Sequence, residues 1–154
     1  MAPLVLENLQ SLKQFIGREI AVTDWFPVTQ ERIQKFAEAT EDRQWIHLDR
    51  ERAIKESPYG ATIAHGFLML SLLSYFMKQA IEIRGGIRMA INYGLNRVRF
   101  PSAVRAGSQI RARIRLQSLK DFPDCEEAAF AVSIECEGAD KPCCAAEWIV
   151  RYYS

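Results

Sequence analysis

The amino-acid sequence predicts an α+β fold, in which an antiparallel sheet wraps around one central buried helix. Residue types sort by half: helical periods dominate the first half, and alternating apolar and polar residues dominate the second. Residues 66–83 are apolar around nearly the whole helix circumference, which is typical of a buried helix. Long alternating segments follow that helix. A curved sheet that holds a central helix is the hot-dog arrangement.

The first half is predicted to contain short helices with recognisable first residues. Apolar residues recur with a helical period in 9–16, 30–40 and 50–55. Each of these segments follows a residue of a type that commonly caps helices, namely Asn8, Thr29 and Asp49. Residues 19–28 alternate well enough for a strand. Residues 42–48 have no helical period, and we expect a loop or an irregular turn there.

The second half is predicted to be the sheet. Gly85 and Gly86 end the central helix. Residues 87–92 and 96–100 are expected to form one or two strands, with Gly94 as a bulge. The further strand-like segments are 110–116, 125–137 and 143–153. A sheet of this kind leaves an open edge, and open edges invite pairing. We therefore expect a homodimer.

Length and composition describe one ordinary globular domain over residues 1–154. Hydrophobic residues make up 49% and charged residues 25%, which excludes a disordered chain. Twenty basic and nineteen acidic residues give a net charge of +1, which argues against a nucleic-acid binder. The four cysteines form no C-x-x-C pair, so zinc spacing is absent. Without a recognisable leader, we expect reduced thiols and a cytoplasmic location.

Asp42 and His47 are the first candidates for chemistry. Five residues of non-helical chain separate them, so the chain can fold back and bring carboxylate and imidazole to one point. Such a pair can polarise a shared water and transfer a proton. The simpler interpretation is that Asp42 caps a turn and His47 packs inside.

Gly66 is the second candidate, at the start of the central helix. A helix N-terminus exposes free backbone N–H groups, and glycine lets a ligand approach them closely. Such a donor could stabilise a developing thioester oxyanion. The alternative is that Gly66 only permits a tight turn into the helix. We expect the neighbouring His65 to order this turn rather than to perform chemistry.

These two segments resemble the MaoC-like dehydratases, the (R)-specific enoyl-CoA hydratases. Glu41-Asp42-Arg43-Gln44-Trp45-Ile46-His47 is similar to the family pattern Asp-x-Asn-Pro-x-His, and Ile63-Ala64-His65-Gly66-Phe67 to its His-Gly pair. Residues 92–101, Asn-Tyr-Gly-Leu-Asn-Arg-Val-Arg-Phe-Pro, resemble the nodulation-protein-N-like branch. The resemblance runs from about Ser11 to the C-terminus.

The resemblance implies addition of water across a trans-2-enoyl thioester, with no cofactor beyond the coenzyme A of the substrate. It implies that Asp42 and His47 hold and activate the water, without assigning which is the base. It also implies that the Gly66 N–H binds the thioester carbonyl and that Ser74 lines the pocket. Gln44 and Trp45 replace the family's Asn-Pro, so Gln44 is the candidate amide beside the pair.

Arginines are concentrated in residues 97–115, a stretch without one acidic residue. Apolar and polar residues alternate there, so most of these arginines are explained as the solvent-exposed face of a strand. Arg97 and Arg99 lie in the family-like segment and are the better candidates for the phosphates of coenzyme A. Two other functions stay open: a hot-dog thioesterase, and a non-catalytic acyl-thioester-binding protein.

Overall fold

The computed structural model describes residues 2–154. Its elements, in chain order, are β1 (Leu4–Leu6), the 3-10 helix η1 (Leu9–Phe15), β2 (Glu19–Val22), β3 (Phe26–Pro27), α1 (Gln30–Thr40), α2 (Trp45–Leu48), α3 (Arg50–Glu56), α4 (Gly66–Ser71), α5 (Leu73–Ala80), β4 (Ile81–Ile83), β5 (Met89–Arg99), β6 (Gln109–Asp121), β7 (Glu126–Cys136) and β8 (Cys144–Tyr153). The predicted α+β order, helices first and long strands after, is confirmed.

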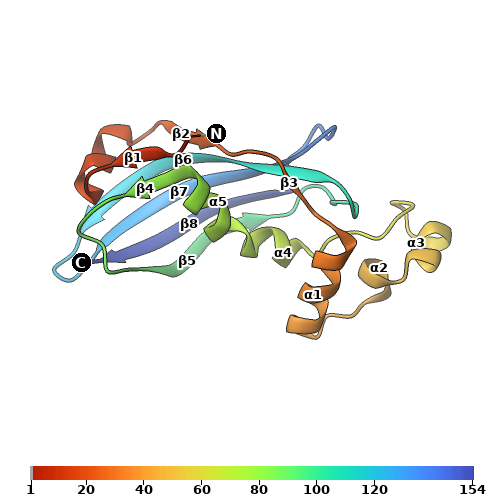
Figure 1. Ribbon diagram of the computed structural model, residues 1–154. Coiled ribbons are helices and arrows are strands. Elements are labelled where there is room, and N and C mark those ends of the chain that lie inside the picture. The colour runs from red at the N-terminus through yellow and green to blue at the C-terminus, as the bar shows by residue number, and fades with distance from the viewer. Residues whose placement is uncertain (1) are drawn as a thin grey trace.

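The large sheet is antiparallel, with the strand order β2-β6-β7-β8-β5 and with β3 paired to the end of β6. It arches over α4 and α5, which lie in its hollow (Figure 1). Side chains along β7 and β8 alternate between buried and half-buried, so one sheet face packs on the helices and the other meets solvent. The predicted hot-dog arrangement is therefore correct.

Helices α1 to α3 lie beyond one end of the sheet, beside the start of α4 (Figure 1). The predicted caps form as expected. The side chain of Thr29 accepts a hydrogen bond from the N–H of Arg32, and that of Asp49 accepts one from Arg52. Asn8 caps η1 in the same way, through the N–H of Ser11.

The central helix differs from the single buried helix predicted over 66–83. It is interrupted at Leu72 and ends at Ala80. Residues Ile81–Ile83 form β4, which pairs in parallel with β1. The β-branched isoleucines favour a strand once a partner is available, and that partner lies far away in the sequence. The helix is also not buried all round, because Phe67 is 69% exposed.

Two smaller expectations also change. Residues 45–48, expected to lie in a loop, form the one-turn helix α2, which is too short to show a period. The strand expected over 19–28 divides into β2 and β3, because the chain leaves β6 between them. Of the one or two strands expected around Gly94, the structure forms one, β5, with bulges at 92–94 and 95–97.

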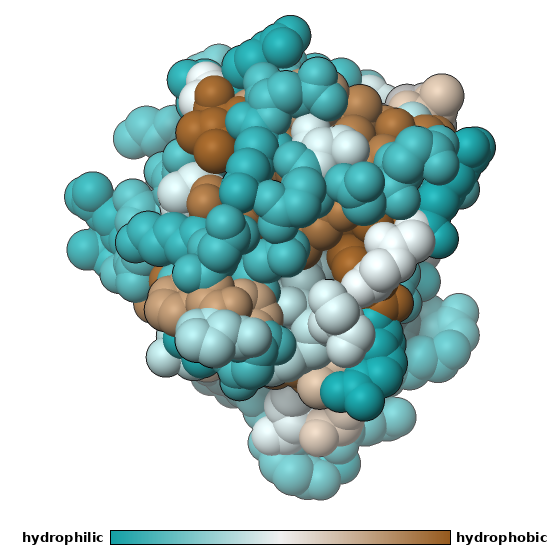
Figure 2. Space-filling view, turned by 90° about the vertical axis from the view of Figure 1, so that its left-hand side faces the viewer, coloured by the Kyte–Doolittle hydropathy of each residue, from teal (hydrophilic) through white to brown (hydrophobic). Residues whose placement is uncertain are grey.

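Figure 2 shows the end of the molecule that carries the C-terminus. Hydrophilic side chains cover most of this face, and the hydrophobic patches lie between them. Within residues 2–154, no helix is long and apolar enough to cross a membrane.

Candidate active site

Asp42 lies in the short loop that joins α1 to α2. The chain turns there because Glu41, which ends α1, adopts a left-handed conformation with φ of 64°. This conformation is uncommon for a residue other than glycine, and such residues often occur at functional sites. The side chain of Asp42 is 52% exposed, so its carboxylate is open to solvent and to a ligand.

His47 lies on α2, and hydrogen bonds hold both its side chain and its main chain. Its Nδ1 donates a hydrogen bond to the carbonyl oxygen of Ile63 at 2.7 Å, because a carbonyl can only accept. Its own carbonyl oxygen accepts from Nε2 of Gln30 at 2.8 Å. His47 is only 7% exposed. The proton on Nδ1 leaves the lone pair of Nε2 available to accept another proton.

His65, the residue before α4, connects the two candidates. Its Nε2 donates to the backbone oxygen of Asp42 at 3.0 Å and lies 4.0 Å from the carboxylate. Its ring stacks on that of His47 with the centroids 3.7 Å apart, and Phe36 packs at 4.9 Å. The buried Nδ1 of His65 has no partner within residues 2–154. His65 therefore fixes the main chain that carries Asp42.

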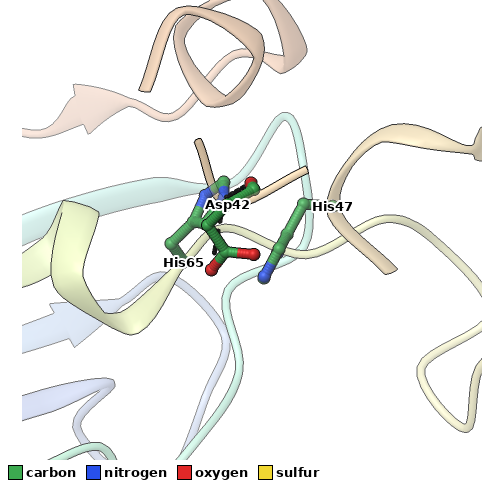
Figure 3. Close-up of side chains that lie close together, drawn as sticks. All are labelled: Asp42, His47 and His65. Carbon is green, nitrogen blue, oxygen red and sulfur yellow. Dashed lines mark hydrogen bonds and ion pairs between the residues drawn. The ribbon is translucent and has the colours of Figure 1, made fainter. Parts of the chain in front are cut away.

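The carboxylate of Asp42 and ring nitrogens of both histidines all lie within 4.8 Å of one another. Figure 3 shows the carboxylate and a ring nitrogen of His47 pointing toward one another. The backbone N–H of Gln44 lies 3.4 Å from the carboxylate oxygen Oδ1 and donates to it. The structure thus brings Asp42 and His47 together, as their spacing allowed.

Burial lowers the pKa of His47 below its ordinary value of 6.5. The hydrogen bond to Ile63 opposes this shift by favouring the charged ring. Proximity to His65 lowers the pKa further, and the charge of Asp42 raises it. Burial is the largest of these effects, so His47 is neutral at pH 7 and can act as a proton acceptor.

The geometry favours proton transfer over metal binding at this cluster. A zinc ion bound by two histidines lies in both ring planes, about 2.0–2.1 Å from each nitrogen. The rings of His47 and His65 are stacked, with only 21° between their planes, so their lone pairs cannot meet at one ion. In addition, Nε2 of His65 carries the proton donated to Asp42.

Gly66 begins α4, and its N–H makes no hydrogen bond within residues 2–154. It lines a cavity of about 220 Å³ together with Ile63 and Phe100. A Cβ atom at position 66 would lie 3.0–3.2 Å from the ring of Phe100. A larger residue at position 66 would therefore push the ring of Phe100 by a few tenths of an ångström.

Ser74 and Gln44 lie apart from this cavity. Ser74, on α5, lines a second cavity of about 390 Å³ between the central helix and β5, with Trp148 and Leu95 in its wall. Gln44 precedes α2 and is exposed, and its side chain makes no cap. Gln44 contacts the pair through its backbone rather than through the amide that the resemblance implies.

Arg97 and Arg99 lie on the opposite face of the sheet from the central helix. On β5 they pair with Glu147 and Ala145, whereas the intervening Val98 pairs with Ala146 and turns inward. Within one chain, the structure does not bring these arginines close to Asp42 and His47. They line an outer groove instead.

Comparison of the sequence with known families identifies a domain family. The MaoC like domain profile matches residues 11–135, which is most of the chain. The chain belongs to this family. It is 44% identical over 147 residues to 3-hydroxyacyl-thioester dehydratase Z of Mycobacterium tuberculosis (strain ATCC 25618 / H37Rv), covering 95% of this chain and 96% of the relative. It is also 41% identical to Nodulation protein N of Rhizobium leguminosarum bv. viciae. That alignment covers 92% of this chain and 89% of the relative.

Solved structures confirm the hot-dog fold of this MaoC-like chain. The monoamine oxidase regulatory protein from Archaeoglobus fulgius superposes with a TM-score of 0.78 at 22% identity, over 100% of this chain and 99% of that one. The R-hydratase PhaJ1 from Pseudomonas aeruginosa superposes with a TM-score of 0.71 at 22% sequence identity. The superposition covers 90% of this chain and 82% of PhaJ1. The resemblance seen in the sequence is therefore correct at the level of family and fold.

The supporting contacts made by two residues of this MaoC-like site, Gln30 and His65, could not be expected from the sequence. Gln30, the first residue of α1, donates to the carbonyl of His47 and accepts from the hydroxyl of Thr62. His65 was expected to order the start of the helix, but its partners are Asp42 and His47. These contacts join residues 17 to 32 positions apart, and no short motif encodes them.

Proposed function

We propose that this protein is an (R)-specific enoyl-thioester hydratase, which adds water across trans-2-enoyl thioesters and catalyses the reverse dehydration. The observation that carries the proposal is the approach of the Asp42 carboxylate and a His47 ring nitrogen to within 4.8 Å. The 44% identity to a protein named 3-hydroxyacyl-thioester dehydratase supports hydro-lyase chemistry. Two groups that converge in this way do not support a binding protein without activity.

The proposed reaction uses Asp42 and His47 as one proton-transfer unit. The oxygen of a water held between them bonds to C3 of the substrate, and a proton of that water passes to the pair. The pair returns a proton to C2 on the same face, so it ends in its starting state. Two groups this close titrate together, and the reaction is therefore assigned to the pair rather than divided between acid and base.

After water has bonded to C3 and before C2 is protonated, negative charge develops on the thioester oxygen. In the proposal, the unpartnered N–H of Gly66 donates to that oxygen, where a fixed donor lowers the barrier most. Ser74 lines the second cavity, between the central helix and β5, which we propose holds part of the acyl chain. The proposal involves no cofactor beyond coenzyme A, which is part of the substrate.

We also propose that the protein works as a homodimer paired along β5. This strand is the last of the large sheet, and its outer edge has no strand partner within residues 2–154. Its apolar side chains Ile91, Tyr93 and Leu95 are 46%, 55% and 42% exposed. An exposed apolar edge strand is a template for pairing with a second chain.

The test is hydration of crotonyl-CoA, followed as loss of enoyl absorbance. Wild-type protein should hydrate it, and Asp42→Asn and His47→Ala should each lower kcat by about 10²–10⁴-fold, as expected for loss of a positioned proton-transfer group. Asp140→Asn, an exposed carboxylate in the turn after β7, is the matched control and should retain wild-type activity.

Full activity in either pair variant would exclude the proposed mechanism. Release of free coenzyme A thiol without hydration would assign the protein to the thioesterases instead. Circular dichroism of each variant separates loss of chemistry from loss of fold.

A further inference from the structure

A groove lies on the outer face of the sheet, away from the central helix. It encloses about 580 Å³, and four arginines from two strands line it: Arg97, Arg99, Arg113 and Arg115. Two carboxylates, Glu19 and Glu147, also line it, which leaves an excess of positive charge.

Strand register places these arginines in two adjacent rows across the sheet. In the first row, Arg113 on β6 pairs with Ser133, Ser133 with Ala145, and Ala145 with Arg99 on β5. In the second row, Arg115 and Arg97 occupy the same outer positions, with Ala131 and Glu147 between them. The groove thus has small residues along most of its floor and an arginine at each end of both rows.

The width of this groove suits a phosphate-bearing ligand. Neighbouring strands lie about 4.8 Å apart, so the arginine backbones on β6 and β5 are about 14 Å apart. Long guanidinium side chains from both sides can converge over the small floor residues, and guanidinium matches phosphate in charge and shape.

Most of these guanidinium groups are not already neutralised by partners. Arg97 and Arg115 form no ion pair within residues 2–154, and Arg99 contacts only the carbonyl of Val98. Arg113 differs, because it is held by Glu135 and Glu19. Three exposed arginines around an open groove repel a second copy of the same face, so charge favours an anionic occupant.

The groove and the Gly66 cavity share one lining residue just after β5. Pro101 lines both of them. The preceding residue, Phe100, places its ring over Gly66, and Arg99 before it lines the groove. A chain-like ligand bound at Gly66 can therefore pass over Pro101 onto the arginine face.

We propose that this outer groove binds the phosphorylated nucleotide end of coenzyme A while the thioester lies at Gly66. The inference rests on the proposed hydratase function, and it places the nucleotide end of the substrate on the outer face of the sheet. It adds Arg115 on β6 as a residue that recognises substrate across the sheet from Arg97.

The test compares two crotonyl thioesters, crotonyl-CoA and crotonyl-pantetheine, which lacks the nucleotide and its phosphates. In the double variant Arg97→Gln/Arg115→Gln, the KM for crotonyl-CoA should rise about tenfold or more, because charge-assisted hydrogen bonds are lost. Its KM for crotonyl-pantetheine should equal that of wild type. Arg84→Gln, which removes an exposed arginine paired with Glu7 on the other side of the fold, should change neither value.

Equal KM values of double variant and wild type for crotonyl-CoA would overturn the groove assignment and leave the hydratase function standing. An equal rise with both substrates would also overturn it, since the arginines would then act on the whole site. If only the KM for a crotonyl-acyl-carrier protein rose, the face would be a docking surface for an acidic protein instead.

A binding measurement separates failure of this inference from failure of the proposed function. Calorimetric titration with free coenzyme A needs no catalysis. Wild type should bind it, and the double variant should bind about tenfold or more weakly. If coenzyme A binds equally well to both, the groove is not its site, whatever the enzyme assay shows.

Discussion

The imidazole rings of His47 and His65 stack with their centroids 3.7 Å apart and their planes only 21° apart. Each ring also makes one hydrogen bond to a main-chain carbonyl. His47 donates to Ile63, and His65 donates to Asp42. The loop bearing the carboxylate and the helix bearing the imidazole are thus joined through a residue that leads into the central helix.

We predict that His65 positions Asp42. In His65→Phe the stacked ring remains but the donor to the Asp42 carbonyl is lost, so kcat should fall by about 10–100-fold while KM changes little. Phe36→Leu is the matched control, because it changes the packing on His65 and keeps this hydrogen bond. Steady-state kinetics on crotonyl-CoA measure the effect. A His65→Phe enzyme with wild-type kcat would contradict the positioning role.

The pH dependence should reflect the lowered pKa of His47. The neutral ring persists to a pH below the ordinary value of 6.5, so kcat/KM should stay level as the pH falls through 6.5 and decline only at lower pH. Because the chain has two histidines, NMR titration of their ring protons can follow His47 directly, with His47→Gln assigning its signal. A His47 pKa at or above 6.5 would be inconsistent with the buried site.

The same shift predicts a loss of stability on acidification. Below about pH 6.5 the unfolded chain binds a proton at His47 that the folded chain resists, so the free energy of unfolding falls as the pH is lowered. Urea denaturation of wild type and His47→Gln at several pH values measures this. The difference between the two proteins should move in favour of the variant as the pH decreases through this range.

Gly66→Ala should destabilise the protein by about 1–3 kcal/mol, because the new Cβ would press on the ring of Phe100. Gly94→Ala is the control, since a Cβ there has nothing within 4 Å. Thermal unfolding measures both. Adding Phe100→Leu to Gly66→Ala should recover stability by making room. If Gly66→Ala unfolds at the wild-type temperature, the close approach of Phe100 does not constrain position 66.

Ile91→Lys should convert the proposed dimer to a monomer by placing a charge on the exposed side of β5. Ile54→Lys, on α3, is the control because Ile54 is even more exposed, at 59%, and lies outside the sheet edge. Light scattering after size-exclusion chromatography gives the mass of each. A dimeric Ile91→Lys protein, or a monomeric wild type, would count against pairing along β5.

The four cysteines should be unreactive in the folded protein, since all are buried and unpaired. Burial raises the pKa of Cys143 to about 12 and that of Cys144 to about 11, so almost no thiolate is present at pH 8. A thiol-specific chromogenic reagent should therefore count four thiols only after denaturation. Rapid labelling of the native protein would show that this part of the sheet opens.

Much of the fold could be read from the sequence because its signals are local. Thr29 and Asp49 cap helices through N–H groups three residues ahead, and the alternation of β6 follows from its own residues. The strand β4 could not be predicted in this way, since residues 81–83 continue an apolar helical pattern. They become a strand because β1, more than seventy residues earlier, supplies their hydrogen bonds.

In the candidate site, too, some features follow from local sequence signals and others from contacts between distant segments. The sequence by itself determined the fold class, the family, and Asp42, His47 and Gly66 as candidates, because those residues lie in two short motifs. The tertiary structure alone decided that His65 joins Asp42 to His47, and that Arg97 lies in one row with Arg115. The physical reason is that ring stacking and cross-strand register depend on how distant segments meet, whereas caps and periodicity depend on neighbours along the chain.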